Sequence, residues 1–279
     1  MRYLFFVLFL ASTLFAFKYE LSSPTIANGK TLLIKFEKDI NIVYEDVEFL
    51  GHKYQVFDNY VLVPVSYYEK PKTAKLKINY TDYTKPNSKI IELQVLKGDY
   101  KQEKIKVQKS KVSLSKKDKK RSAKEYKEAT DIYNTITPEF YIKTKFIMPL
   151  NSKVTSLFGN ARVYNGSLKG YHSGTDFRAK VGTPLIATND GRVVLAKDRF
   201  YSGGSIILDH GHGIYTCYYH MSKFDVKVGD IVKKGQLLGL SGVSGRVTGP
   251  HLHFSARVGG IQVDPIELIE FMNKNILRK

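Results

Sequence analysis

The chain has 279 residues, which suits one large domain or two of modest size. Hydrophobic residues make up 43% of it and aromatic residues 13%, so the composition argues against global disorder. The formal net charge of +18 favours anionic surroundings. Nucleic acid, an anionic membrane face and an acidic wall polymer are partners of that kind.

Residues 1–16 are typical of a secretory signal peptide. A basic start, Met1-Arg2, precedes an apolar run that continues to Ala16, where we expect cleavage. The run is short for a membrane span, although a retained N-terminal anchor is the alternative, since Leu14 is unusual three positions before the cut. No cysteine follows the run, so no lipid anchor is expected. Export argues against nucleic acid as a partner.

The single cysteine, Cys217, cannot form an internal disulfide. It lies in a strand-like stretch of aromatic and β-branched residues, which predicts a small buried hydrophobe rather than a nucleophile or a ligand.

Residues 17–98 predict a small β-sandwich-like domain. Short segments rich in β-branched and aromatic residues recur there, and Pro, Gly, Asn and Asp separate them. The segments are 31–36, 43–49, 60–67 and 90–96. Nothing in this domain has the pattern of a chemical site.

Residues 99–137 predict a basic linker followed by a helix. Between residues 99 and 127, twelve Lys or Arg stand against four Asp or Glu, which indicates a mobile connector. An electrostatic tether to an anionic wall or membrane is the functional alternative. Ser122 and Glu125 have the spacing of a capping box, so we expect a helix over 122–136 that ends before Pro138.

Residues 138–265 predict a second, glycine-rich β domain with many turn signals. A helical pattern with Pro265 at its start follows, so residues 266–279 are expected to form a C-terminal helix. The fold class predicted for the whole chain is therefore mostly β.

Histidines carry the main chemical signal, because six of the seven fall between residues 172 and 253. His172 and Asp176 are four apart, and a tight turn can direct both side chains to one point. His251 and His253 are two apart, which on a strand places them on one face and turns Leu252 and Phe254 into a core. Imidazole and carboxylate suit Zn²⁺, and three protein ligands leave a fourth position for water, as in catalytic sites.

These residues, with the Tyr219-His220 pair, closely resemble the M23 (LytM or lysostaphin-type) zinc metallopeptidases. Further segments resemble the family in its own order, so that the resemblance covers about residues 146–265. They are 156–159, 182–187, 190–193, 229–236 and 244–250. The resemblance implies an antiparallel β-sheet peptidase domain of the LytM type.

The resemblance also implies roles for single residues. His172, Asp176 and His253 would bind one Zn²⁺ per chain, and His220 and His251 would be the non-ligand histidines of the active site. We favour His251 as the general base, because the H-x-H motif brings it closest to the metal, and the other histidine would then steady the oxyanion or protonate the leaving amine.

Two more histidines, His210 and His212, stand in a metal-rich-looking Asp-His-Gly-His-Gly segment. For them the resemblance implies a structural or substrate-side role without metal ligation.

By this resemblance the chain is expected to be a monomeric, zinc-dependent peptidoglycan hydrolase of a Gram-negative periplasm, in cell-wall remodelling or cell-shape control. The expected bond is the D,D cross-link between stem peptides. Carboxypeptidase trimming is a further possibility, and a glycine bridge is less favoured. Because family members with extra N-terminal domains are often latent, residues 17–98 are expected to limit access to the site.

Two other functions are alternatives. A wall-binding or amidase-activating module with a decayed site is disfavoured because no expected ligand is missing. A biotinyl or lipoyl carrier domain, which residues 228–236 resemble, is disfavoured because no lysine stands at a suitable hairpin tip.

Overall fold

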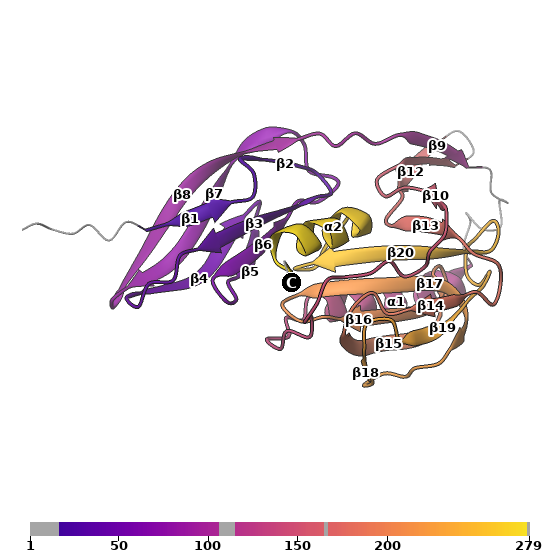
Figure 1. Cartoon of the computed structure of the whole chain (residues 1–279). Helices are drawn as coiled ribbons and strands as arrows, with labels where there is room; N and C mark the ends of the chain where they lie inside the picture. The colour runs from indigo at the N-terminus through magenta and orange to yellow at the C-terminus, as the bar shows by residue number, and fades with distance from the viewer. Residues whose placement is uncertain (1–16, 106–114, 165–166, 278–279) are drawn as a thin grey trace, which may run out of the picture.

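The computed structural model describes residues 17–105, 115–164 and 167–277. The expected signal peptide, residues 1–16, lies outside the described residues. The prediction of a mostly β fold is confirmed: strands dominate, and the described ranges hold two helices (Figure 1). Neither helix is long and apolar enough to cross a membrane.

Two sheets make up the upstream part of the chain. One has the order β1-β3-β6 and the other β2-β8-β7-β4-β5. Their facing side chains share one apolar cluster, because the side chains of a strand alternate between its two faces. The strands of the first sheet are β1 (Tyr19–Leu21), β3 (Thr31–Phe36) and β6 (Tyr60–Pro64). Those of the second are β2 (Thr25–Ala27), β4 (Ile42–Phe49), β5 (His52–Gln55), β7 (Lys72–Asp82) and β8 (Lys85–Leu96).

The downstream part is a larger sheet in which every strand pair is antiparallel. Its main path is β10-β13-β20-β17-β16-β15-β18, and β14, β19 and β21 pair off this path. The strands are β10 (Val154–Ser156), β13 (Thr175–Arg178), β14 (Pro184–Ile186), β15 (Gly191–Arg199), β16 (Gly203–Asp209), β17 (Ile214–Phe224), β18 (Ile231–Val232), β19 (Leu237–Ser241), β20 (His251–Val258) and β21 (Ile261–Val263). Cys217 is fully buried in β17, as predicted.

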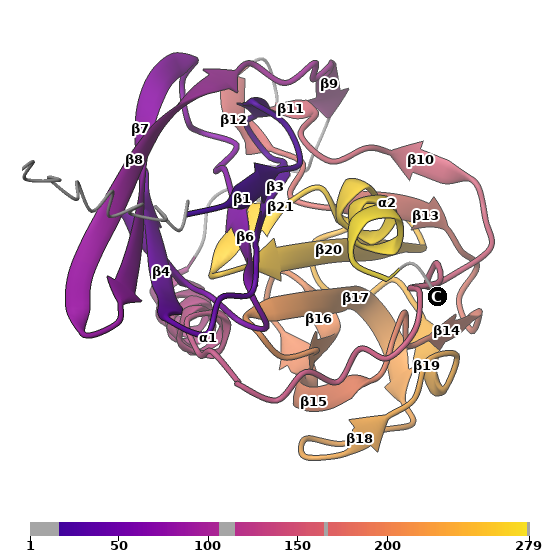
Figure 2. The ribbon, with the colours of Figure 1, turned by 60° about the vertical axis from the view of Figure 1, so that its left-hand side comes forward.

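The sheet β1-β3-β6 belongs to both parts of the molecule. In β3, Leu32 and Ile34 lie in the upstream core, whereas Leu33 between them points the other way. Leu33 and Leu62 join the core of the downstream sheet, which explains why β3 is buried on both faces. The two parts of the chain therefore pack as neighbours through an apolar layer (Figure 2).

The C-terminal helix α2 (Pro265–Asn275) begins at the predicted proline and ends a few residues earlier than expected. The Asp264 carboxylate caps it by accepting hydrogen bonds from the backbone N–H groups of Ile266 and Glu267. Its buried face packs into the downstream core through Leu268, Ile269 and Met272.

Helix α1 (Lys116–Tyr133) begins earlier than predicted, so the capping-box assignment was wrong. The N-cap is Ser115, whose Oγ accepts from Asp118 N at 3.1 Å. Ser122 lies within the helix, and its hydroxyl donates to the Lys119 carbonyl at 3.1 Å.

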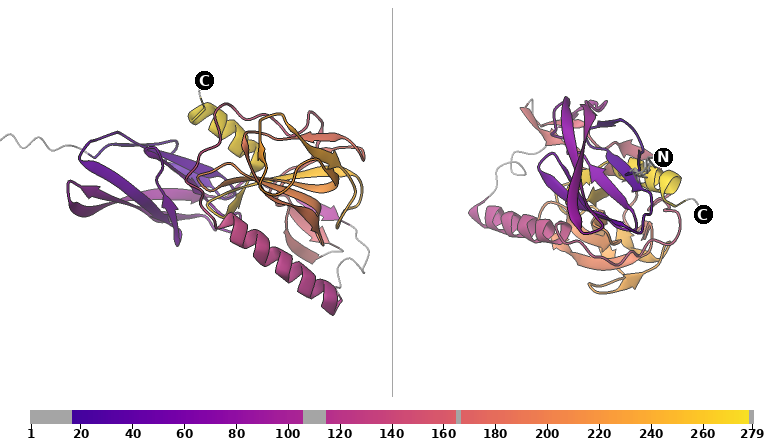
Figure 3. Two further views of the ribbon diagram at one scale, coloured as in Figure 1. Left: turned by 90° about the horizontal axis from the view of Figure 1, so that it is seen from below. Right: turned by 90° about the vertical axis from the view of Figure 1, so that its left-hand side faces the viewer.

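The prediction of a mobile connector over 99–127 also needs correction, because ordered elements occupy much of it. β9 (Gln102–Ile105) runs parallel to β11 (Ala161–Tyr164), which pairs with β12 (Ser167–Tyr171) in a third sheet. Charged side chains of α1 have partners at the end of β15 and directly after it: Arg121 pairs with Asp198 at 2.9 Å, and the Glu125 carboxylate accepts from Phe200 N at 2.7 Å. Composition alone could not reveal these distant partners. Figure 3 shows α1 lying along the downstream sheet.

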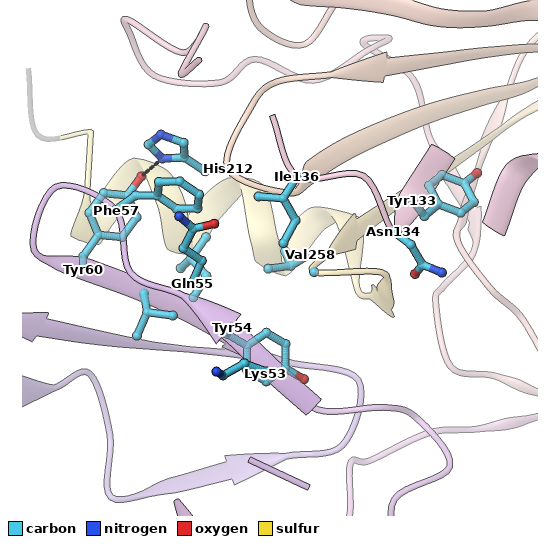
Figure 4. Close-up of a pocket in the computed structure, with 13 residues that line it drawn as sticks. Lys53, Tyr54, Gln55, Phe57, Tyr60, Tyr133, Asn134, Ile136, His212 and Val258 are labelled. Atoms are coloured by element: carbon cyan, nitrogen blue, oxygen red, sulfur yellow. Dashed lines mark hydrogen bonds between the residues drawn. The ribbon is translucent and has the colours of Figure 1, made fainter. Parts of the chain in front are cut away.

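A cavity of about 190 Å³ lies where β5 and β6 of the upstream part, the end of α1 and β20 meet (Figure 4). His212 lies at its edge, where Tyr60 contacts it through a 3.1 Å hydrogen bond to Nδ1. The His212 ring stacks on Phe57 at 4.0 Å and on Phe140 at 4.6 Å. His212 thus joins the two parts of the chain.

Polar contacts also join the upstream and downstream parts of the chain at the start of α2. Lys30 forms a 2.8 Å ion pair with Asp264, and the Asp264 N–H donates to the Gly29 carbonyl at 2.9 Å. Beside them, Glu267 has one buried carboxylate oxygen, Oε2, without a hydrogen-bond partner within the described ranges. Burial raises the pKa of Glu267 to about 7, and the positive charge of Lys30 offsets this only in part.

This raised pKa predicts a pH-dependent stability. The folded chain favours the protonated form of Glu267. The contribution of this group to the free energy of unfolding is therefore complete below the unfolded pKa of ~4.3 and is lost as pH rises through about 7. Glu267→Gln should therefore leave the free energy of unfolding unchanged near pH ~4 and raise it near pH ~8 by on the order of 3 kcal/mol. Chemical denaturation at both pH values measures this. Glu92→Gln, at an exposed position of β8, is the control. An equal effect of Glu267→Gln at both pH values would contradict the assignment.

Candidate metal centre

The register of three neighbouring strands sets the positions of the central residues. Asp176 on β13 lies opposite His253 on β20, and His253 lies opposite Tyr219 on β17. His172 precedes β13, and its backbone exchanges hydrogen bonds with Gly159 and Asn160. Leu252 and Phe254, on the other face of β20, are fully buried in the core, as predicted.

Three of the predicted residues converge on one point. His172 Nε2 lies 2.9 Å from Asp176 Oδ1 and 3.1 Å from His253 Nδ1, and the last two atoms are 2.8 Å apart. The three side chains are buried, and their ligand atoms lie within 4.8 Å of one another. Within the described ranges this is the only group of its kind. The donor set of two imidazoles and a carboxylate fits Zn²⁺.

The Asp176 carboxylate is held in its ionised form. Burial opposes its ionisation, but hydrogen bonds and charge from His172 and His253 outweigh burial and hold the pKa of Asp176 well below its usual range. This group therefore offers a negative charge that could hold a cation.

Contacts behind His172 fix which of its nitrogens faces the centre. Its Nδ1 lies 2.9 Å from the Leu157 carbonyl and 2.8 Å from Ser156 Oγ. A carbonyl only accepts, so Nδ1 carries a proton, and Nε2 is the nitrogen that faces Asp176 and His253. The sequence places residues 156–159 within the family resemblance, but it gives no signal for this supporting role.

His251 and His220 lie beside the ligand group rather than within it. His251 Nε2 is 3.7 Å from Asp176 Oδ1, and the rings of His251 and His220 are 4.8 Å apart. Nδ1 of His251 bonds to the Gly249 carbonyl and Nδ1 of His220 to the Ser244 carbonyl, each at 2.9 Å. Both rings thus carry their proton on Nδ1 and leave Nε2 able to accept another.

His220 has an unusual backbone and a depressed basicity. Its φ of 64° is a left-handed conformation that costs a non-glycine residue about 1 kcal/mol, at a point where the register between β16 and β17 shifts. Burial, followed by electrostatic repulsion from His253 and His251, lowers the pKa of His220 to about 3. His220 is therefore neutral near pH 7.

The remaining downstream histidines lie outside this group. His210 is fully buried, with Nδ1 bonded to the Asp190 carbonyl at 2.7 Å and Nε2 to Thr216 Oγ1 at 2.8 Å. Burial lowers the pKa of His210 to about 4. His212 packs at the interface described above, so both make structural contacts here.

Comparison with known proteins bears on this arrangement. The model of peptidase family M23 matches residues 170–265, which include all five residues predicted for the site. Residues 170–265 belong to peptidase family M23. This M23 domain is 45% identical over 96 residues to the peptidoglycan DD-endopeptidase ShyA of Vibrio cholerae, covering 34% of this chain and 22% of that protein. It is 51% identical over 87 residues to the glycyl-glycine endopeptidase ALE-1 of Staphylococcus capitis, covering 30% and 24%. The matches thus span less than a quarter of either relative.

One solved structure matches far more of the chain. A candidate peptidase M23 from Pseudomonas aeruginosa superposes with a TM-score of 0.67 at 26% identity, over 87% of this chain and 94% of that one. Because this match extends well beyond the M23 domain, much of the upstream architecture recurs in that protein.

The close approach of β13 and β20 gives a test of the centre. A Cβ added at Gly174 would lie 2.6 Å from His253 Nε2 and 2.4 Å from the Phe254 carbonyl oxygen, too close for either. We expect Gly174→Ala to displace the His253 ring and to weaken Zn²⁺ binding ~10-fold or more, measured by competition with a chelator. Gly249→Ala, whose added methyl group meets nothing within 4 Å, is the matched control. Wild-type affinity in Gly174→Ala would show that His253 does not need this space.

Proposed function

We propose that this chain is a zinc-dependent peptidoglycan hydrolase that cleaves the D,D cross-link between stem peptides, acting in the periplasm in cell-wall remodelling or cell-shape control. The observation that carries the proposal is the convergence of His172 Nε2, Asp176 Oδ1 and His253 Nδ1, with two proton-accepting histidines beside them. A complete set of this kind favours an enzyme over a wall-binding or amidase-activating module.

The side chains define how hydrolysis would proceed. Zn²⁺, when bound by His172, Asp176 and His253, supplies polarisation of the scissile carbonyl and a bound water of lowered pKa. His251, whose Nε2 lies 3.7 Å from Asp176 Oδ1 and whose Nδ1 faces a carbonyl, takes the water proton as general base. His220 is the second neutral acceptor, and once protonated it can donate to the oxyanion or the leaving amine.

The proposed bond follows the Vibrio relative, which is named a DD-endopeptidase. The staphylococcal relative is named for a glycyl-glycine bond, so similarity within the M23 domain leaves that bond as the alternative. Digestion of purified sacculi with identification of the products by mass distinguishes the two, and it also reveals any carboxypeptidase trimming.

We further propose that the upstream domain limits access to the centre. Its Tyr67 stacks on Tyr171 with ring centroids 3.9 Å apart, and Tyr171 directly precedes the ligand His172. Tyr67 also meets the edge of Phe158, which follows the Leu157 carbonyl that holds His172. These contacts support the proposal because they cover both segments that carry His172.

The ligand and base roles predict different outcomes for two substitutions. Purified wild-type protein should hold about one Zn²⁺ per chain and lose muropeptide cleavage when a chelator removes the metal. His172→Ala should lose both metal and cleavage, whereas His251→Ala should keep the metal and lose ~10²–10⁴-fold in rate. Metal analysis and product chromatography measure the two quantities. Cleavage by metal-free protein would end the proposal.

The restraint by the upstream domain predicts a gain of activity. Tyr67→Ala removes an aromatic stack worth about 1 kcal/mol, and the looser contact should raise the rate of cross-link cleavage several-fold. Tyr83→Ala, at an exposed tyrosine of the same domain, is the control and should leave the rate unchanged. A Tyr67→Ala variant no faster than the control would argue against restraint.

A further inference from the structure

A residue from outside the M23 domain reaches the back of the metal centre. Tyr133, at the end of α1, is only 4% exposed and packs in a cluster with Tyr215 and Cys217 of β17. Its hydroxyl lies 3.4 Å from Cys217 Sγ. The helix that was expected to be a linker thus inserts a side chain between itself and the sheet that carries the site.

Two contacts connect Tyr133 to the ligand His253. The hydroxyl groups of Tyr133 and Tyr219 form a 2.9 Å hydrogen bond. The Tyr219 ring lies nearly parallel to that of His253, with an interplanar angle of 8° and centroids 5.6 Å apart. Because these two residues are directly opposite on β17 and β20, the stack restricts rotation of the His253 ring.

A second set of contacts runs from Tyr133 toward His172. The Arg257 guanidinium lies 4.2 Å from the centroid of the Tyr133 ring. Arg257 also donates to Gln262 Oε1 at 3.1 Å, and the Gln262 amide donates to the carbonyl of Ser173, the residue after His172. Tyr133 therefore contacts the supports of two ligands from one position.

We propose that Tyr133 and Tyr219 are positioning residues of the metal centre, which hold the His253 ring in the orientation that binds the metal. The inference rests on the metal site of the proposed function and extends it to a helix outside residues 170–265.

Variants of the full mature chain can separate the hydrogen bond from the stack. Tyr133→Phe and Tyr219→Phe each remove the hydroxyl bond and keep the rings, whereas Tyr219→Leu removes the stack. Tyr126→Phe alters an exposed tyrosine of the same helix and is the matched control. The readouts are the Zn²⁺ dissociation constant from chelator competition, the visible spectrum of the Co²⁺-loaded protein, and the unfolding midpoint of the metal-free protein.

We expect Tyr219→Leu to weaken Zn²⁺ binding ~10–100-fold and to change the Co²⁺ spectrum. Each Phe variant should weaken binding ~2–10-fold, and the double Phe variant no more than one alone, because both remove the same bond. Wild-type affinity and spectrum in all variants would overturn the proposal, as would a lowered unfolding midpoint with unchanged affinity. Wild-type protein that binds no Zn²⁺ would contradict the proposed metal site itself. That result differs from a failure of the positioning proposal, in which wild-type protein binds Zn²⁺ and the variants bind it equally well.

Discussion

The antiparallel pairing of β13, β20 and β17 is the constraint on which the site depends. Main-chain hydrogen bonds along this ladder place Asp176 opposite His253, and His253 opposite Tyr219. Side chains alternate between faces, so a slip of one residue in either pairing would turn a ligand into the core. The sheet therefore fixes the ligand geometry through its backbone, and the surrounding side chains refine it.

Electrostatic interactions then determine the ionisation of Asp176 and the orientation of the histidine rings. The Asp176 carboxylate lies between two imidazoles in a buried space, where it stays ionised because both donate to it or attract it. His220 and His251 each donate a hydrogen bond from Nδ1 to a carbonyl, so Nε2 is the nitrogen available to accept a proton. A carbonyl partner on Nδ1 likewise fixes which nitrogen of His172 faces Asp176 and His253. Within β17, His220 is the one non-glycine residue with a positive φ, so the strained backbone coincides with the site.

Short-range patterns in the sequence predicted the mostly β fold and the facing of β20, because both follow from the period of two in a strand. The H-x₃-D and H-x-H spacings located the candidate ligands for a similar reason, since each pair lies within one local segment. Contacts between distant segments could not be predicted. Helix α1 begins at Lys116 after the Ser115 cap, and its Arg121 and Glu125 bond to residues 77 and 75 positions away, whereas the charge run alone indicated a connector. The link from Tyr133 to Tyr219 spans 86 residues and has no motif.

The shared sheet β1-β3-β6 limits how the molecule can open. Leu33 and Leu62 are part of the downstream core, and exposing such a side chain to water costs roughly 1.5–3 kcal/mol. Lifting the whole upstream domain away from the M23 domain would uncover both, together with the apolar surface they cover. A local displacement of Tyr67 from Tyr171 uncovers neither leucine. A displacement confined to the aromatic contact therefore costs less free energy than a separation of the two parts of the chain, in which both leucines would lose their apolar contacts.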